Sequence, residues 1–147
     1  RVNAALLSMI DAPSFEAVIG FVTSDMALLL DHEQTALFFE VADSLPHGQY
    51  GGAQVVYEGF VYEWLGQRDV LLEAVERPAP ELFGCKAGDV QSHALVRLNV
   101  AEGMPPGLLV LGHRDPMYYA TGLATEQVES MAAVLERCVR KWLRHPI

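Results

Sequence analysis

Leu108-Leu109-Val110-Leu111-Gly112-His113-Arg114-Asp115-Pro116 is a stretch that predicts a buried strand stopping at a fixed corner. Four consecutive apolar residues are typical of a strand that is covered on both faces. Gly112 permits a backbone geometry that other residues resist. Pro116 lacks a backbone N–H and favours extended geometry at Asp115, so the strand should end there. Arg114 and Asp115 are expected to hold this structural corner through hydrogen bonds and a local ion pair.

Periodicity on either side of this strand predicts both helices and strands. Residues 92–100 alternate between two faces, as do residues 33–41, so both segments are predicted strands. Residues 14–30 and 121–144 place apolar side chains at helical spacing. Gly20, inside the first of these helices, is expected to mark a close packing contact. The order of these elements, with shorter ones at 2–10, 55–57, 60–65, 70–75 and 78–83, is that of an α+β fold.

Several short motifs occur in a characteristic order along the chain. The pattern Leu-Leu-x-Leu-Gly-x-Arg-Asp-Pro at 108–116 is followed by Tyr118, Tyr119, Gly122 and Thr125. Upstream of it lie Ala12-Pro13-Ser14-Phe15, Glu81-Leu82-Phe83-Gly84 and Ser92-x-Ala94-Leu95-Val96-x-Leu98. In these segments the chain resembles a bacterial GAF-like family that is described as a domain of unknown function, of the DUF484 type. The chain departs from the family pattern at Arg97, where a proline is expected.

The resemblance implies a fold and no particular reaction. It implies a single GAF-like domain over residues 1–147, with a central antiparallel sheet of about five to six strands. The N- and C-terminal helices would pack on one face of this sheet, and variable loops would lie over the other. Residues 1–12 would be the end of a longer N-terminal helix.

Composition narrows the class of protein. The 147 residues are 51% hydrophobic with a mean hydropathy of +0.18, and we interpret this excess as an oligomer interface or a large core. The net charge of −9 is unlike the basic footprint of a nucleic-acid-binding protein. No apolar run approaches the roughly 18 residues that a membrane-spanning helix needs. Because two cysteines are too few for a disulfide framework, a cytoplasmic location is expected.

The sequence contains fragments of catalytic and metal-binding motifs, but each fragment lacks the other residues or the spacing that its chemistry requires. His113-Arg114-Asp115 lacks the asparagine of a kinase catalytic loop, because Ala120 stands at that position. Ser92 and His93 are adjacent on a strand and face opposite sides, so they cannot form a nucleophile–base pair. The five histidines show no metal-ligand spacing with one another or with the cysteines. We therefore expect no catalytic residue, no metal and no cofactor.

His93 and Arg97 lie on the same face of the predicted strand 92–100. If that face turns away from the terminal helices, the two side chains form the floor of the usual GAF-like pocket and suit an anionic or polar ligand. The roof of this pocket would come from Tyr57, Tyr62 and Trp64. The alternative is that His93 and Arg97 reach solvent or pair with nearby acidic residues, and that the aromatic residues are core.

The predicted C-terminal helix carries an apolar stripe at heptad-like spacing. Such a stripe covers the sheet, meets a second copy of the chain, or does both. GAF-like domains commonly dimerise through their terminal helices, and Trp142 lies so near the chain end that it is hard to bury within one small domain. We therefore expect a homodimer whose interface includes Leu6, Met131, Leu135, Cys138 and Trp142.

Three functions remain open. The favoured one is a non-catalytic sensory or regulatory domain, dimeric, with or without a small polar ligand. The second is a protein-interaction module whose pocket is filled by its own side chains. The third is a cysteine-dependent reductase of a small molecule, in which Lys86 or His93 would activate Cys85. Cys138, in the helical stripe, is expected to be inert. None of the three involves nucleic acid or a membrane.

Overall fold

The computed structural model describes residues 1–41, 52–77 and 79–144, apart from the side chains of residues 85, 86, 143 and 144. The predicted thiol chemistry of Cys85 and Lys86 therefore lies outside the described residues. The described chain begins with α1 (Val2–Asp11), α2 (Phe15–Gly20), the π-helical turn η1 (Phe21–Asp25) and α3 (Met26–Leu29). It continues with β1 (Gln34–Glu40), β2 (Gln54–Val56), α4 (Phe60–Leu65), β3 (Val70–Ala74), α5 (Pro80–Phe83), the 3-10 helix η2 (Gly84–Asp89), β4 (Ser92–Leu98), β5 (Gly107–His113), α6 (Met117–Ala120) and α7 (Thr125–Arg144).

The strands form a sheet in the order β2-β1-β5-β4-β3, with the predicted buried strand β5 at its centre. β5 pairs antiparallel with β1, where Leu109 lies opposite Leu37, and with β4, where Val110 lies opposite Leu95. β3 also runs antiparallel to β4, but β2 runs parallel to β1. The α+β class is confirmed, and the sheet is mixed rather than wholly antiparallel. Alternating side chains indicate a strand but not its direction, so the sequence pattern carries no signal for this pair.

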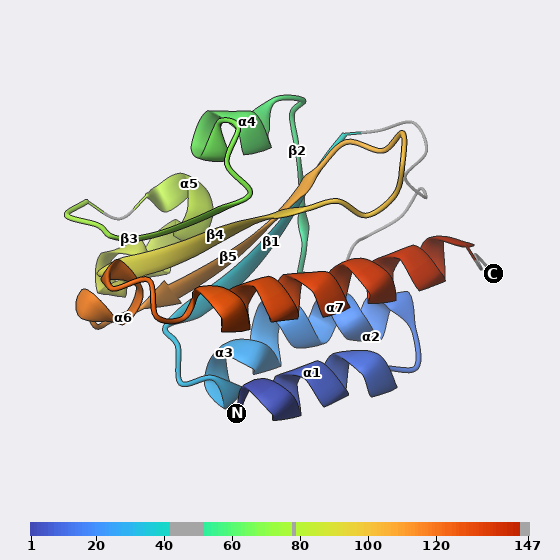
Figure 1. The fold of residues 1–147 in the computed structure, drawn as a ribbon, viewed down its shortest axis with the longest axis horizontal. Coiled ribbons are helices and arrows are strands. Elements are labelled where there is room, and N and C mark those ends of the chain that lie inside the picture. Colours follow the sequence, from blue (N-terminus) through green and yellow to red (C-terminus); the bar gives the residue numbers. More distant parts are fainter. Residues whose placement is uncertain (42–51, 78, 145–147) are drawn as a thin grey trace.

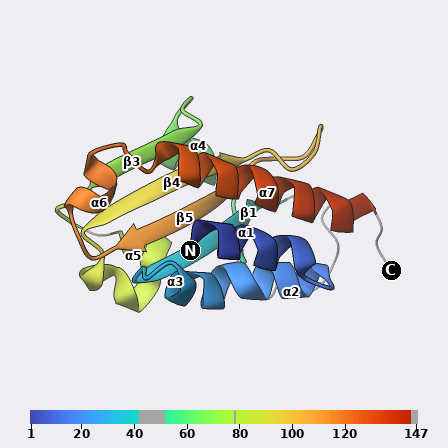
Figure 2. The same cartoon turned by 60° about the horizontal axis from the view of Figure 1, so that its bottom comes forward.

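Helices cover both faces of the sheet. α1, α2 and α7 lie on one face, and α4 and α5 lie on the other (Figures 1 and 2). The side chains of β4 and β5 alternate between these two layers: Ala94 and Leu109 belong to the core beneath the terminal helices, and Leu95 and Val110 to the core beneath α4 and α5. The expected packing of the N- and C-terminal helices on one face is therefore confirmed.

The helices differ in two places from the sequence prediction. The segment 14–30 is helical and begins with the Ser14 hydroxyl accepting a backbone hydrogen bond, but a π-helical turn interrupts it at η1. Within this turn the Thr23 hydroxyl donates to a carbonyl of the preceding turn, a bond that competes with regular helix geometry. The last helix begins at Thr125 rather than near residue 121, because Gly122 has a φ of +76° and separates α6 from α7.

Gly112 is required for the close approach of two layers rather than for an unusual torsion. A Cβ atom at this position would lie 2.7 Å from Cε1 of Phe83 and 2.8 Å from Cγ2 of Val90. Both of these side chains are buried against β5. A Cβ at Gly20, in contrast, would have nothing within 4 Å, so the expected close contact at Gly20 is wrong.

Replacing Gly112 with alanine should lower the free energy of unfolding by about 1–3 kcal/mol, because Phe83 and Val90 would have to move within a packed layer. The matched control is Gly20→Ala, which should leave stability unchanged or raise it by up to about 1 kcal/mol, since alanine favours the helix. Both variants are compared with the parent chain by urea unfolding followed by circular dichroism. Equal stability of Gly112→Ala and the parent would contradict the packing argument.

Candidate functional site

The sheet face beneath α4 and α5 is where a GAF-like pocket is expected. In the described residues this layer is a continuous apolar cluster that joins the helices to β1, β4 and β5. Its largest members are fully or almost fully buried: Phe38, Phe60, Leu65, Leu82, Phe83, Leu95 and Leu108. The side chains of the protein itself therefore occupy the described part of this layer.

A buried carboxylate fixes α4 above the sheet. One carboxylate oxygen of Glu40 accepts the backbone N–H of Gly59 at 3.0 Å, and the other accepts that of Val61 at 2.9 Å. The Glu40 residue is only 4% exposed, and its burial is offset by these two bonds and by the positive end of the helix dipole. Glu40 thus ties the end of β1 to the start of α4.

His93 lies on the α5 side of β4, as the alternation predicts, whereas Arg97 lies near the end of β4 and lines a pocket together with Glu129 and Glu136 of α7. Each of the two has partners within the chain. His93 donates from Nε2 to Glu73 at 2.9 Å and stacks on Phe83 at 6.3 Å between ring centroids. Its Nδ1 has no hydrogen-bond partner among the described residues. Arg97 donates to the carbonyl oxygens of Gly66 at 2.7 Å and Arg68 at 3.0 Å, and lies 3.6 Å from the Asp69 carboxylate. The structure therefore agrees with the alternative prediction, in which His93 and Arg97 pair with nearby groups of the chain rather than with a ligand.

The three predicted roof residues lie on and beside α4. Tyr57 and Tyr62 are 55% and 61% exposed, so neither is a core residue. Trp64 is half-buried and packs against the apolar cluster. Tyr57 and Trp64 line a cavity of about 380 Å³, whose lining includes neither His93 nor Arg97. The predicted floor and roof are therefore not brought together around one cavity in the described residues.

The structural corner after β5 is held by partners from distant parts of the sequence. Arg114 donates to Glu33 at 2.8 Å and to Asp31 at 3.0 Å, rather than pairing with its neighbour Asp115. The Asp115 carboxylate instead accepts the backbone N–H of Met117 at 2.9 Å and so begins α6, with Pro116 at the N-cap. The hydrogen bond from Arg114 and its positive charge lower the pKa of the Asp31 carboxyl.

A cluster of four aromatic side chains lies behind this corner, and sequence reasoning did not find it. His32 donates from Nδ1 to the Leu30 carbonyl at 2.9 Å and accepts the Tyr119 hydroxyl at Nε2 at 2.5 Å. His113 stacks on Tyr118 with the ring centroids 4.0 Å apart, and its edge meets the His32 ring at 4.9 Å. These residues come from two segments that only pairing of β1 with β5 brings together. A spacing rule within one segment has no means of detecting them.

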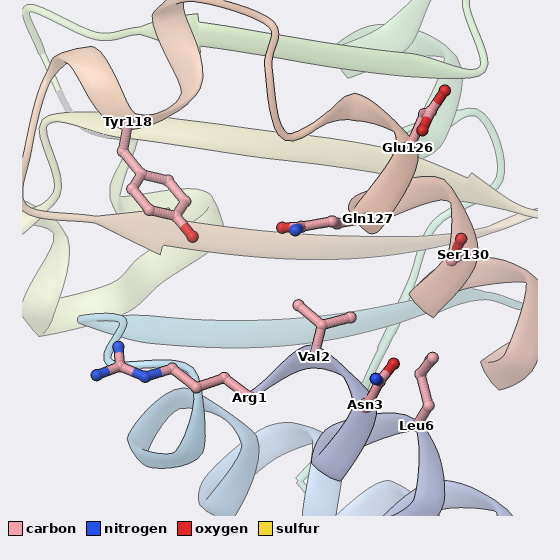
Figure 3. A pocket seen from close by; sticks show the side chains of 8 residues that line it. All are labelled: Arg1, Val2, Asn3, Leu6, Tyr118, Glu126, Gln127 and Ser130. Atoms are coloured by element: carbon pink, nitrogen blue, oxygen red, sulfur yellow. The ribbon is translucent and has the colours of Figure 1, made fainter.

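A groove lies between the two terminal helices and reaches this cluster. It has a volume of about 580 Å³. Figure 3 shows its walls, with Val2 and Leu6 on α1 and Gln127 and Ser130 on α7, while the Tyr118 ring closes one end. Because Tyr118 also stacks on His113, the groove and the structural corner share a side chain.

The predicted dimer residues divide into two groups. Met131 and Leu135 are 3% and 0% exposed in the core between α7 and the sheet, so they offer no surface to a second copy. This corrects their assignment to an interface: the heptad-like stripe on α7 is used within the chain. Leu6, Cys138 and Trp142 are half-buried at the margin of that core. The Cys138 thiol donates to the Met9 carbonyl at 3.5 Å, and burial raises its pKa.

The described residues contain no group of three His, Cys, Asp or Glu side chains arranged to hold a metal ion. Across residues 1–41, 52–77 and 79–144, no helix combines the length and apolar character needed to span a membrane.

The free energy of unfolding should fall as the pH is lowered from about 6.5 to about 4, because burial lowers the pKa of His32 to about 4 in the folded chain. In this pH window His32 is protonated in the unfolded chain but not in the folded chain. The resulting loss in the free energy of unfolding, at the acid end of the window, is on the order of 3 kcal/mol. His113 acts in the same direction, since burial lowers its pKa too. Urea unfolding between these pH values measures the effect.

The matched variant for this measurement is His32→Gln, whose stability should vary less with pH across the same window. The carboxyl of Asp31 does not interfere, because its pKa is lowered from 3.8 and its own loss of stability falls below the window. The same pH dependence in the parent and in His32→Gln would contradict the assignment.

Comparison with known proteins places the chain in a family. Residues 1–144 match the family described as "Protein of unknown function, DUF484". No curated protein is similar enough in sequence to count as a relative. The phycocyanobilin-bound GAF domain from a cyanobacterial phytochrome superposes with a TM-score of 0.65 at 14% identity, over 100% of this chain and 98% of that one.

A second solved structure, the chromophore-binding domain of the unusual bacteriophytochrome RpBphP3 from R. palustris, superposes with a TM-score of 0.58 at 10% identity. This chain aligns over 97% of its own length and spans 61% of that protein. At such identities the likeness shows the fold and not the ligand. The match over residues 1–144 and the GAF architecture show that this chain belongs to the DUF484 family and has a GAF-like fold.

Proposed function

We propose that this chain is a non-catalytic regulatory domain of the sensory GAF type, which acts as a homodimer through its helical layer. The observation that carries the proposal is the pairing of His93 with Glu73 and of Arg97 with Asp69 and two backbone carbonyls. An anionic ligand on this face would need the N–H donors of these two side chains, and they are already engaged within the chain. These pairings support a regulatory domain that acts through protein contacts and has a self-filled layer, and they disfavour a ligand pocket on the sheet.

The two similar phytochrome structures are described by the pigments they hold, one as phycocyanobilin-bound and the other as chromophore-binding. A pigment above the sheet requires space between the strands and the covering helices. In the described residues, the strand side chains that face this layer, Phe38, Leu95 and Val110, are 0% exposed and belong to one apolar cluster with α4 and α5. Pigment binding is therefore not part of the proposed function.

The chemistry of Cys138 supports a non-catalytic role. Thiol reduction chemistry needs a thiolate, and a raised pKa lowers the thiolate fraction at neutral pH. Burial raises the pKa of Cys138, and its thiol is already engaged with the carbonyl of Met9. A reductase that relies on Cys138 to resolve an oxidised partner is accordingly disfavoured.

The outer face of α1 is the surface best suited to a second copy. Leu7 and Ile10 are 59% and 54% exposed and lie three residues apart, so they share one side of the helix. Asp11 is the one charged residue of α1, although the chain carries a net charge of −9. Apolar contacts with few charges are typical of the centre of a homodimer interface, and a two-fold axis would bring the same face of both copies together.

Changing Leu7 and Ile10 together to glutamate (L7E/I10E) should convert the dimer into a monomer, because both new charges would be buried against their counterparts. Light scattering during size-exclusion chromatography gives the mass of each species. The matched control is Leu123→Glu, which alters a residue that is 88% exposed in the turn before α7 and should leave the dimer intact. A monomeric parent chain, or a double variant that stays dimeric while folded, would contradict the proposal.

A further inference from the structure

We propose that the cavity beside α4 is a binding site for a small organic cation, of the methylated ammonium class. The cavity is lined by Tyr57, Phe60, Glu63, Trp64 and Glu81. This site is separate from the α1 surface and does not depend on the dimer or on the regulatory role.

The walls of the cavity are aromatic rings set at an angle to one another. Phe60 and Trp64 are four residues apart on α4 and therefore lie on one side of the helix, with their centroids 6.4 Å apart and their planes at 56°. Tyr57 stands nearly perpendicular to Phe60, at 81° and 5.5 Å. These three rings line the cavity. An aromatic ring attracts a cation through its negative face.

The polar groups of the cavity are two carboxylates without a cationic partner. Glu63 accepts a hydrogen bond from the Tyr57 hydroxyl, and Glu81 comes from the neighbouring helix α5. Within the described residues, neither glutamate forms an ion pair with a lysine, arginine or histidine. Both carboxylates are exposed, so they are accessible to a positively charged ligand.

The lining favours an organic cation over a metal ion. A calcium or magnesium ion requires about six oxygen ligands, and most of this lining is aromatic carbon. A methylated ammonium group is weakly hydrated, so it can exchange its water for ring faces while its charge is neutralised by the carboxylates. The volume of about 380 Å³ leaves room for such a group.

The rings are held in place before any ligand arrives. Glu40 anchors the first turn of α4 through two backbone hydrogen bonds, and Phe60 packs on the buried Phe38 ring with centroids 5.1 Å apart. A site whose walls are already ordered loses little conformational entropy on binding. Trp64 is half-buried and lines the cavity, so its indole can report on an occupant.

The test uses the indole Nε1–H signals of Trp64 and Trp142 in a ¹⁵N-labelled chain, titrated with choline chloride at constant ionic strength. We expect a saturable shift of the Trp64 signal and no shift of Trp142, which lies on α7 and serves as an internal control. The neutral isostere 3,3-dimethylbutan-1-ol should bind at least about tenfold more weakly, because it lacks the charge. Equal affinities for choline and the isostere would overturn the proposal, as would the absence of a saturable shift.

Two variants with matched chemistry localise the site. Glu81→Gln should weaken choline binding about fivefold, since it removes one of the two negative charges near the surface. Glu126→Gln removes an exposed carboxylate from the groove between α1 and α7 and should leave binding unchanged. Equal weakening by the two variants would show general electrostatic attraction and overturn the assigned site.

A last titration distinguishes a free metabolite from a modified side chain as the source of the cation. A short peptide with a central trimethyllysine is compared with choline in the same experiment. Tighter binding of the peptide would indicate that the cavity beside α4 binds a methylated side chain of another protein. Equal or tighter binding of choline would indicate a site for a small molecule. Failure of both ligands to shift Trp64 would overturn the proposal while leaving the dimer untouched.

Discussion

The contact between Gly112 and the side chains of Phe83 and Val90 is the constraint on which the rest of this structure depends. β5 is the central strand, all of its residues are buried, and it joins β1 to β4. Helix layers press on both of its faces, and a Cβ atom at Gly112 would lie within 2.8 Å of both neighbours on the α5 side. Because α5 lies so close to β5, the apolar side chains between them pack directly on the sheet. These side chains occupy the layer in which a GAF-like pocket is expected.

The two faces of the sheet consequently have different roles. Beneath α4 and α5, the polar groups on β4 are bound to Glu73, Asp69 and nearby carbonyls, so they contribute to the fold. On the other face, α1 packs against α7, and a groove between them includes Tyr118, whose ring stacks on His113.

Much of the fold could be predicted because it depends on local patterns. The apolar run at Leu108–Leu111 predicts β5 and its burial, and the alternation in residues 92–100 correctly separates Ala94 from Leu95, which belong to the cores on opposite faces of the sheet. Local patterns also explain the errors. The direction of β2 leaves no trace in alternation, and the stripe containing Met131 and Leu135 has the same spacing whether it covers a sheet or a second chain.

The site was less predictable because its partners are distant in sequence. Arg114 pairs with Asp31 and Glu33, and His32 meets Tyr119 across the β1–β5 pairing. Only the strand register brings these residues together, and no spacing rule contains that register. The cavity beside α4 is partly predictable, because several of its residues are close in sequence. Phe60 and Trp64 are four residues apart, with Glu63 between them, and this spacing is visible once the helix is assigned.

The most direct test of the central claim, that the polar groups beneath α4 hold the fold rather than await an anionic ligand, is the free energy of unfolding of Arg97→Met. The account predicts a loss of about 1–3 kcal/mol relative to the parent chain, because the carbonyls of Gly66 and Arg68 would lose the donor they share. A residue reserved for a ligand is usually a cost to stability, so its removal should leave stability unchanged or raise it. An Arg97→Met chain as stable as the parent, or more stable, would contradict the account.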